Sequence, residues 1–233
     1  MKASKTKITP KPFTDPWGLY QQIVRYIPDK SITGKKVLDM GCGDGWIEKI
    51  LLSKGAKYVN GIDLSPEVIK KAKKQNLKKV SYRVSDAINL PFKKSSFDVI
   101  VAFEVLEHIQ PKGEKMMFSE VVRVLKPGGE FFLTTPHKHL FVTLTDPAWW
   151  FIKHRHYSLL EIRKFLKDAH LDVKRLYVRG GVYTVFLLLS MYFSKWVTKK
   201  PPLFYTFLLN KSREEYRKDN GIMNIFLHAV KPK

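Results

Sequence analysis

The amino-acid sequence predicts an α/β fold built on a mostly parallel sheet, and two patterns carry this prediction. Short apolar runs of strand character alternate with segments of helical periodicity along most of the chain, which is the βαβ rhythm of a parallel sheet. The first of these runs ends in a glycine-rich loop, Gly41 to Gly45, that leads into a helix. A loop of this kind at the carboxyl end of a strand forms the ligand crevice of open α/β sheets.

The predicted elements follow one another closely. A short helix is expected over 16–27, where apolar side chains recur at helical spacing. The expected strands cover 36–40, 58–62, 80–84, 97–102, 130–134, 172–178 and 224–230. Two helix starts are marked by their capping residues: Ser65 precedes Pro66, and Ser158 begins a capping box with Glu161.

The stretch before the last predicted strand is unusually apolar. Residues 182–193 contain almost no polar side chain, but twelve residues are too few to cross a bilayer as a helix, which needs about 20. A second, aromatic helix is expected over 203–209. We therefore predict a helical insertion over 182–220. Three roles stay open for it: a cap over an apolar pocket, a helix pair in a membrane interface, or a buried packing or homodimer element.

Length and cysteine content set the domain organisation. A chain of 233 residues can bury one substantial core, and nothing in its composition requires a second domain. We expect a basic flexible tail over 1–12 and a single domain over 13–233. Cys42 is the sole cysteine, so an intramolecular disulfide is excluded and a reducing, cytoplasmic environment is indicated, with peripheral membrane attachment left open.

The chain is strongly basic, with 42 Lys and Arg against 21 Asp and Glu and a formal charge of +21. Such an excess favours an anionic partner, and nucleic acid, anionic lipid headgroups and phosphorylated substrates all qualify. The alternative is a solvated lysine surface, as the lysines over 70–79 illustrate.

The glycine-rich loop is built to admit a ligand close to the backbone. Gly41, Gly43 and Gly45 remove Cβ atoms where the chain must turn. The dinucleotide-binding fingerprint needs a glycine where Trp46 stands, so a loop that holds a diphosphate is disfavoured. Asp39 beside the loop suits a ligand with a cationic amine and repels a pyrophosphate.

Several motifs in order resemble one family. The D-x-G-x-G-x-G motif from Asp39 to Gly45 is followed by segments that fit the same family at 61–65, 85–87, 97–108 and 124–131. Together they resemble the class I methyltransferases that use S-adenosylmethionine, and most closely the type 11 subgroup, over roughly residues 17–178. The resemblance implies a Rossmann-like three-layer sandwich with a seven-stranded, mostly parallel sheet whose last strand is antiparallel.

The resemblance also implies S-adenosylmethionine as the cofactor and assigns its contacts. Asp39 and the loop backbone at Gly41 and Cys42 would hold the methionine part. Asp63, 24 positions after Asp39, would bind the ribose hydroxyls, near the usual offset of about 20 residues. Further implied contacts come from Tyr20, Gly43, Gly45, Trp46, Phe103 and Glu104.

The adenine contacts follow the third strand. Asp86 with the amide of Ala87 would bind the adenine amine, and Leu64 and Ile88 would sandwich the purine. A turn-forming role for Asp86, bonded to its own backbone, is the alternative. For Asp63 the alternative is a helix cap, but Ser65 already fills that role.

The resemblance places the active-site loop just after the fourth strand, at His108. Methyl transfer depends mainly on in-line positioning of the acceptor with water excluded. A hydroxyl or ammonium acceptor must also lose a proton, and the pKa of a histidine suits His108 for this task. The alternative is that Glu107 and His108 cap or orient the following loop.

Five of the seven histidines fall between positions 108 and 156. Two H-x-H pairs stand among them, at His137/His139 and His154/His156. We expect no metal site, because the pairs lack an accompanying cysteine or carboxylate cluster and Lys138 and Arg155 would repel a cation. The segment 136–157, with Trp149, Trp150 and Phe151, is predicted instead as a substrate loop with aromatic walls.

These observations favour an S-adenosylmethionine-dependent methyltransferase that acts on a small-molecule or lipid-like acceptor. An RNA methyltransferase is one alternative, supported by the net charge but not by the residues after the fourth strand, where 103–106 lacks an N-P-P-Y-type tetrad. The other alternative is a non-enzymatic, membrane-peripheral protein that retains the fold.

Overall fold

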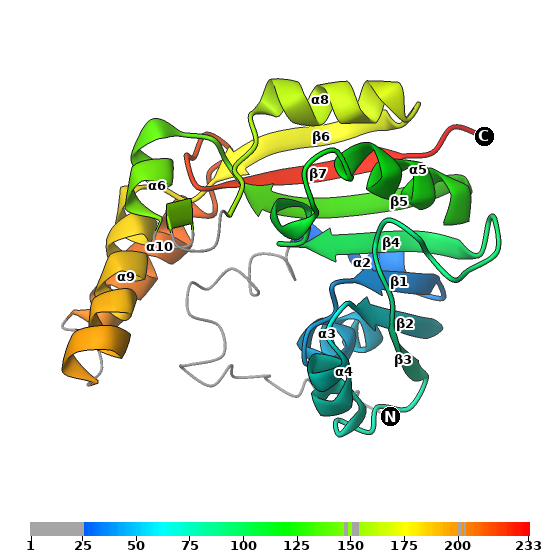
Figure 1. The fold of residues 1–233 in the computed structure, drawn as a ribbon, viewed down its shortest axis with the longest axis horizontal. Helices are drawn as coiled ribbons and strands as arrows, with labels where there is room; N and C mark the ends of the chain where they lie inside the picture. Colours follow the sequence, from blue (N-terminus) through cyan, green and yellow to red (C-terminus); the bar gives the residue numbers. More distant parts are fainter. Residues whose placement is uncertain (1–25, 147–148, 151–153, 200–201, 203) are drawn as a thin grey trace.

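The computed structural model describes residues 26–146, 149–150, 154–199, 202 and 204–233. The tail expected over 1–12 and most of the helix expected over 16–27 lie outside these residues. The described chain forms a seven-stranded sheet with the order β3-β2-β1-β4-β5-β7-β6 (Figure 1). Its strands are β1 (Lys36–Met40), β2 (Tyr58–Asp63), β3 (Val80–Val84), β4 (Phe97–Phe103), β5 (Leu125–Pro136), β6 (Asp172–Arg179) and β7 (Asn224–Val230).

Strand directions confirm the predicted sheet. The pairs β1–β2, β1–β4, β2–β3 and β4–β5 are parallel, and β7 is antiparallel to both of its neighbours, β5 and β6. All seven expected strands are present. The largest difference is β5, which begins at Leu125 because this residue pairs with Phe97 before a register shift in the β4–β5 ladder.

Helices cover both faces of the sheet and its carboxyl edge. They are α2 (Asp29–Ile32), α3 (Trp46–Ser53), α4 (Pro66–Lys73), η1 (Leu106–His108), α5 (Glu114–Val124), α6 (Leu140–Thr145), α8 (Leu159–Asp168), α9 (Val182–Phe193), η2 (Ser194–Thr198) and α10 (Tyr205–Glu215). Both predicted caps are confirmed. The Ser65 hydroxyl accepts the amide of Val68 at 3.3 Å, and Ser158 and Glu161 form the expected capping box.

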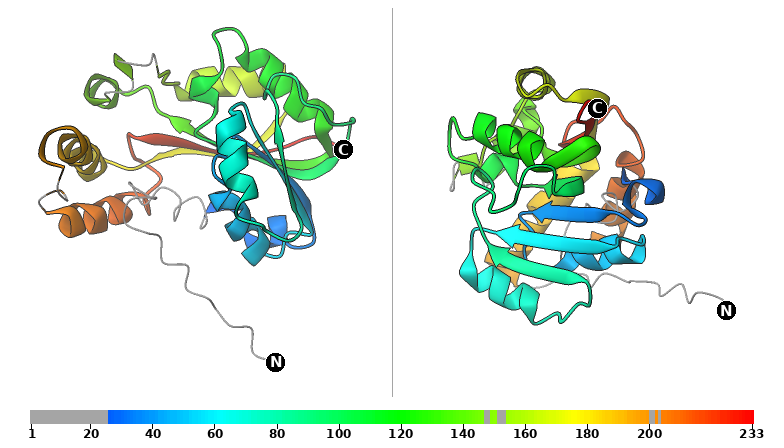
Figure 2. Two further views of the ribbon diagram at one scale, coloured as in Figure 1. Left: turned by 60° about the horizontal axis from the view of Figure 1, so that its bottom comes forward. Right: turned by 90° about the vertical axis from the view of Figure 1, so that its right-hand side faces the viewer.

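Side chains alternate between the two faces of the sheet along each strand, so the hydrophobic core forms two clusters. Leu38 and Met40 of β1 face the cluster that contains the buried side chains of α5 and α8. Val37, on the other face, packs with α3 through Ile47 and Leu51. Figure 2 shows α5 and α8 on one side of the twisted sheet and α2 on the other. Because successive side chains of a strand point to opposite faces, Asp39 lies on the α3 side.

Helices α9 and α10 pack side by side at the carboxyl edge of the sheet (Figures 1 and 2). Glu215 of α10 joins them, since its carboxylate accepts the amides of Gly181 at 3.0 Å and of Tyr183 and Thr184 at 2.9 Å. These are orphan donors at the start of α9, which a carboxylate satisfies and the helix dipole favours. A Cβ at position 181 would stand 2.6 Å from the Glu215 Oε1 atom, which explains the glycine.

The apolar sequence of α9 is divided between a buried and an exposed face. Val185, Leu187 and Leu188 are buried, whereas Phe186 and Phe193 are half or more exposed. Among the described residues, no helix combines the length and the hydrophobicity that a membrane span requires.

Candidate functional site

The acidic residues predicted to bind a ligand gather at one edge of the sheet. Asp39 is the fourth residue of the five-residue β1, Asp63 ends β2, Asp86 follows β3 by two positions, and Glu104 follows β4 directly. Strands β1 and β4 are neighbours although β2 and β3 separate them in the chain, so this edge is the topological switch point where open α/β sheets bind ligands.

The glycine-rich loop adopts the backbone conformation that its sequence predicts. Gly41, Gly43 and Gly45 have φ angles of +73°, +55° and +88°, in the left-handed region that favours glycine. The amides of Gly41 and Cys42 both donate to the Ile62 carbonyl at 2.8 Å. These two N–H groups are therefore used within the protein.

A buried pair of carboxyl groups lies beneath the loop. Asp39 is 1% exposed and Glu48, in the first turn of α3, is fully buried. The Asp39 Oδ2 atom and both Glu48 carboxyl oxygens have no hydrogen-bond partner among the described residues. Burial and then the charge of Glu48 raise the pKa of Asp39, and burial raises the pKa of Glu48 to about 8. The pair is thus a site of unmet hydrogen-bonding capacity that a cationic ligand would fill.

Sequence reasoning missed Glu48. The signal available was an acidic residue among the apolar positions of α3, where the helix faces β1 and β2. Its neighbour Gly61 on β2 leaves room for it, because a Cβ at position 61 would overlap the Glu48 carboxyl group and stand 2.9 Å from Tyr82.

Asp63 links two loops of the site. Its Oδ2 atom accepts the amide of Gly43 at 3.2 Å, and its Oδ1 atom accepts the amide of Ser65 at 2.9 Å. The helix cap is Ser65, as expected, so Asp63 is not needed for that role. Leu64 is 70% exposed beside it, an apolar surface large enough to receive a flat ring.

Asp86 makes the turn contact that the sequence left as an alternative. Its Oδ1 atom accepts the amide of Ile88 at 3.1 Å. Ala87 is buried, and Ile88 is half-buried against the core cluster of the α5 face. Of the remaining predicted contacts, Trp46 begins α3, Phe103 is buried at the end of β4, and Tyr20 lies outside the described residues.

Glu104, at the same edge of the sheet, also borders a cavity. It has a φ of +54°, an uncommon conformation for a residue with a side chain. Its Oε2 atom accepts the Nδ2 donor of Asn224 at 3.0 Å, and the Tyr216 hydroxyl donates to the Oδ1 atom of Asn224 at 2.7 Å. Burial, followed by the charge of Glu107, raises the pKa of Glu104 to about 8.

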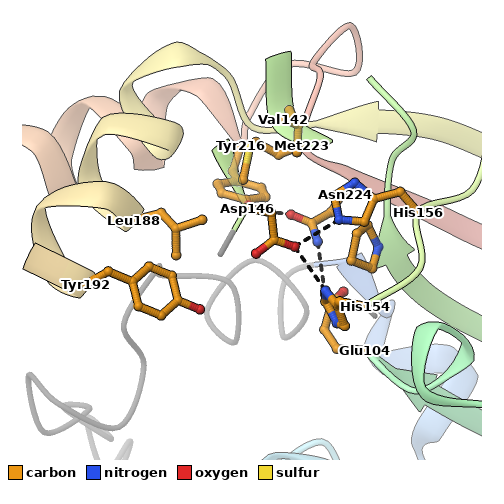
Figure 3. A pocket seen from close by; sticks show the side chains of 11 residues that line it. Glu104, Val142, Asp146, His154, His156, Leu188, Tyr192, Tyr216, Met223 and Asn224 are labelled. Atoms are coloured by element: carbon orange, nitrogen blue, oxygen red, sulfur yellow. Dashed lines mark hydrogen bonds and ion pairs between the residues drawn. The ribbon is translucent and has the colours of Figure 1, made fainter. Parts of the chain in front are cut away.

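The cavity beside Glu104, of about 80 Å³, is enclosed by segments far apart in the sequence (Figure 3). Its lining residues are Glu104, Pro136, Val142, Asp146, His154, His156, Leu188, Tyr192, Tyr216, Met223 and Asn224. One wall is apolar and comes largely from α6 and α9, and the opposite wall carries carboxylates and imidazoles. We refer to this space as the acceptor cavity.

The predicted substrate loop lines this cavity, but not with its tryptophans. Residues Val142, Asp146, His154 and His156 contribute from 136–157. Trp149 and Trp150 are exposed and are not among the lining residues, and Phe151 lies outside the described residues. The aromatic lining of this cavity comes instead from Tyr192 of α9 and from Tyr216. The role of 136–157 as a substrate loop with aromatic walls stays a prediction.

One premise used against a metal site is wrong. The histidine pair at 154 and 156 does have a carboxylate partner, since the Asp146 Oδ2 atom lies 3.1 Å from His154 Nδ1 and 2.9 Å from His156 Nε2. Arg155 does not face this group, because its guanidinium pairs with Glu114. Burial alone would lower the pKa of His154, but its hydrogen bond to Asp146 and its ion pair with Glu107, 3.7 Å away, raise that pKa to about 10.

His108 lies at the rim of this region. It is exposed at the end of η1, and its ring centroid is 4.9 Å from that of His154. It is not among the residues that line the acceptor cavity. Its predicted role as a base stays a prediction.

Known proteins resemble part of this chain in sequence. Norajmaline N-methyltransferase of Rauvolfia serpentina is 40% identical over 118 residues, which are 48% of this chain and 40% of that protein. Ubiquinone biosynthesis O-methyltransferase of Xanthomonas oryzae pv. oryzae is 37% identical over 108 residues, 45% of this chain and 44% of that protein. The chain thus spans less than half the length of these curated relatives.

Solved structures resemble the chain over most of its length. An S-adenosylmethionine-dependent methyltransferase from Mesorhizobium loti superposes with a TM-score of 0.66, covering 94% of this chain and 99% of that one at 17% identity. At this identity the likeness shows the fold alone. Residues 38–133 match the model of a family described as a methyltransferase domain.

Proposed function

We propose that the chain is an S-adenosylmethionine-dependent methyltransferase, because residues 38–133 match the model of a family described as a methyltransferase domain. The observation that carries the proposal is the buried pair Asp39 and Glu48, whose unpartnered oxygens lie under a glycine-rich loop at the switch point of the sheet. S-adenosylmethionine has an ammonium and a sulfonium group, and buried carboxyl groups with unpartnered oxygens next to an open backbone suit both.

The remaining contacts follow the strand ends. We assign the ammonium group to Asp39 with Glu48, and the ribose hydroxyls to Asp63, which the Gly43 and Ser65 amides hold in place. The purine lies between the exposed Leu64 and the segment that follows Asp86, with the Ala87 amide at its edge. A Cβ at Gly43 would meet no atom within 4 Å, so the described residues leave space above this part of the loop.

The chain's own residues contribute mainly by positioning. Methyl transfer needs the acceptor atom in line with the sulfonium methyl group, in a site from which water is excluded. Glu104 borders the acceptor cavity and is held by the Tyr216–Asn224 hydrogen-bond chain, so it can fix a polar end of the acceptor. His108, exposed at the rim, is our candidate for accepting a proton from a hydroxyl or ammonium acceptor and passing it to solvent.

The acceptor is proposed to be a small molecule with an apolar body, or a lipid-like one. The cavity joins an apolar wall of Val142, Leu188 and Tyr192 to an acidic wall that includes Glu104 and Asp146. Its volume of about 80 Å³ accommodates one end of such an acceptor. The N-methyltransferase and O-methyltransferase named among the relatives support this class over RNA, which rests on the charge of +21.

The exposed side of the insertion supports peripheral contact with an anionic membrane. Phe186, Phe193, Trp196 and Phe207 are each at least half exposed on α9, η2 and α10 of a strongly basic chain. A homodimer through the same surface is the alternative. We propose that the protein is cytoplasmic and attaches to the membrane through this surface. Sedimentation with anionic vesicles, compared with neutral vesicles, tests the membrane contact, and light scattering tests the homodimer.

The decisive experiment combines binding and transfer. Calorimetry with S-adenosylmethionine should give a single site that Asp39→Asn weakens at least 10-fold, whereas Glu67→Gln, on the exposed start of α4, should leave the affinity unchanged. Radiolabelled transfer to separated lipid, small-molecule, RNA and protein pools then identifies the acceptor class. Absence of binding at millimolar ligand would favour the non-enzymatic reading and refute the proposal.

Two variants test the acceptor cavity. Tyr192→Ala should lower transfer to the labelled pool several-fold without changing cofactor affinity, because Tyr192 lines the cavity. Phe193→Ala is the matched control, since this neighbour is 58% exposed and outside the lining. Equal activity of the two variants would contradict the placement of the acceptor.

A further inference from the structure

We propose that Asp146, His154 and His156 form a binding site for a divalent cation of the Zn²⁺ class at the wall of the acceptor cavity (Figure 3). Each residue offers one donor atom, and these atoms lie within 4.8 Å of one another. Imidazole nitrogen and carboxylate oxygen are ligands that Zn²⁺ accepts readily, commonly as three protein ligands with one open position.

The donor atoms are already close to the spacing that a metal requires. The Asp146 Oδ2 atom lies 3.1 Å from His154 Nδ1 and 2.9 Å from His156 Nε2. Ligands at 2.0–2.1 Å around a tetrahedral ion are roughly 3.3 Å apart. The two distances from Asp146 are thus within a few tenths of an ångström of that spacing, and the two histidine donors lie within 4.8 Å of each other, so an ion could replace the bridging protons.

Each imidazole also has a partner on its far nitrogen. The Nδ1 atom of His156 lies 3.0 Å from the Thr143 hydroxyl, and the Nε2 atom of His154 lies 3.7 Å from Glu107 Oε1. Metal-binding histidines characteristically have such outer partners, which set the tautomer and the ring orientation. A packing role alone would not require both histidine rings to be oriented toward one carboxylate oxygen.

The surroundings favour a cation. Glu107 is 2% exposed; its Oε2 atom accepts the Thr135 hydroxyl at 3.0 Å, while its Oε1 atom accepts no hydrogen bond among the described residues and lies 3.7 Å from His154 Nε2. Glu104 borders the same cavity with a buried, unpartnered Oε1 atom. Arg155, which would oppose a cation, is held by Glu114 and by the Leu106 carbonyl. Buried carboxylate oxygens that accept no hydrogen bond are costly, and a divalent ion nearby would stabilise both groups.

Asp146, His154 and His156 all line the cavity. With these three protein ligands, one coordination position of the ion would stay open toward the cavity. An open position is the mark of a catalytic rather than a structural Zn²⁺ site. If the proposed methyl transfer is correct, an acceptor hydroxyl or thiol would bind at this position and lose its proton more readily. Cation binding itself does not depend on that function.

The test is a titration of the full chain, freed of metal, with Co²⁺ and with Zn²⁺. We expect one ion per chain, and Co²⁺ should produce visible absorption bands of a low-coordinate site. Asp146→Asn and His156→Gln, which preserve side-chain size, should weaken binding about 100-fold or more. Thr143→Val should weaken binding roughly 10-fold through the outer partner alone.

His139→Gln is the matched control. His139 belongs to the other H-x-H pair, which has no carboxylate within hydrogen-bonding distance among the described residues, so its loss should change affinity less than threefold. Circular dichroism must show that each variant is folded. No stoichiometric ion on the wild-type chain, or unchanged affinity in folded Asp146→Asn, would overturn the proposal. Calorimetry with S-adenosylmethionine on the same samples separates this outcome from failure of the proposed function.

Discussion

Replacing Glu48 by glutamine should make the protein less sensitive to alkaline pH. Glu48 keeps its proton in the folded chain up to about pH 8, whereas an ordinary glutamate loses it near pH 4.5. Between these values the folded state binds more protons than the unfolded state, so the free energy of unfolding falls as the pH rises. Glutamine fills the same space and cannot ionise.

The size of the effect follows from the same two pKa values. A carboxyl pKa raised from 4.5 to about 8 means that ionising the group costs roughly 5 kcal/mol more in the folded state than in the unfolded state. Asp39 and Glu48 titrate as a pair, which spreads this cost over both groups. We therefore expect the wild-type chain to lose about 2 kcal/mol of unfolding free energy between pH 5 and pH 8.5 through Glu48, and Glu48→Gln to be spared this loss.

Urea unfolding followed by tryptophan fluorescence at pH 5, 7 and 8.5 measures the difference. Glu67→Gln is the control, because Glu67 is solvent-exposed on α4 and its pKa is lowered, so it is ionised throughout this range. The control should follow the wild-type pH dependence. Parallel curves for Glu48→Gln and the wild type would refute the buried acid pair.

Three further substitutions test the loop, the cofactor surface and the insertion. Gly41→Ala should lower the free energy of unfolding by about 1–3 kcal/mol in urea titrations, because φ is +73° and the new Cβ would overlap Val105; unchanged stability would contradict the loop geometry. Leu64→Ala should weaken S-adenosylmethionine binding roughly 10-fold in calorimetry without altering the melting temperature, since the side chain is 70% exposed; an equal affinity would remove Leu64 from the site. Glu215→Gln should destabilise the chain by about 1–2 kcal/mol in urea, because it weakens the charged acceptor at the start of α9, and Glu214→Gln on the exposed face should not.

Local sequence patterns were sufficient to predict the helices and strands and one half of the site. Strand runs, the Ser65 cap and the Ser158 capping box each depend on a few consecutive residues, and all are present in the structure. The positive φ angles of Gly41 and Gly43 follow from the same short-range logic. Asp63 is at the predicted strand end for this reason as well.

Long-range packing determined the other half of the site. Asn224 reaches Glu104 across 120 positions of the chain, and no spacing rule relates two residues that meet only because β7 inserts beside β5. Glu48 escaped notice because one acidic residue in a helix ordinarily faces solvent. Trp149 and Trp150 are exposed and do not line the cavity, because composition does not tell which side of a loop faces inward.

The succession of strands and helices along the chain, the turn at the glycine-rich loop and the positions of acidic residues at strand ends were determined by the sequence itself, because side-chain periodicity and backbone sterics act between near neighbours. The tertiary structure alone decided that Glu48 lies under that loop and that Asp146 meets both histidines. Those contacts arise from burying side chains of separate segments against one another, and this packing has no local signature.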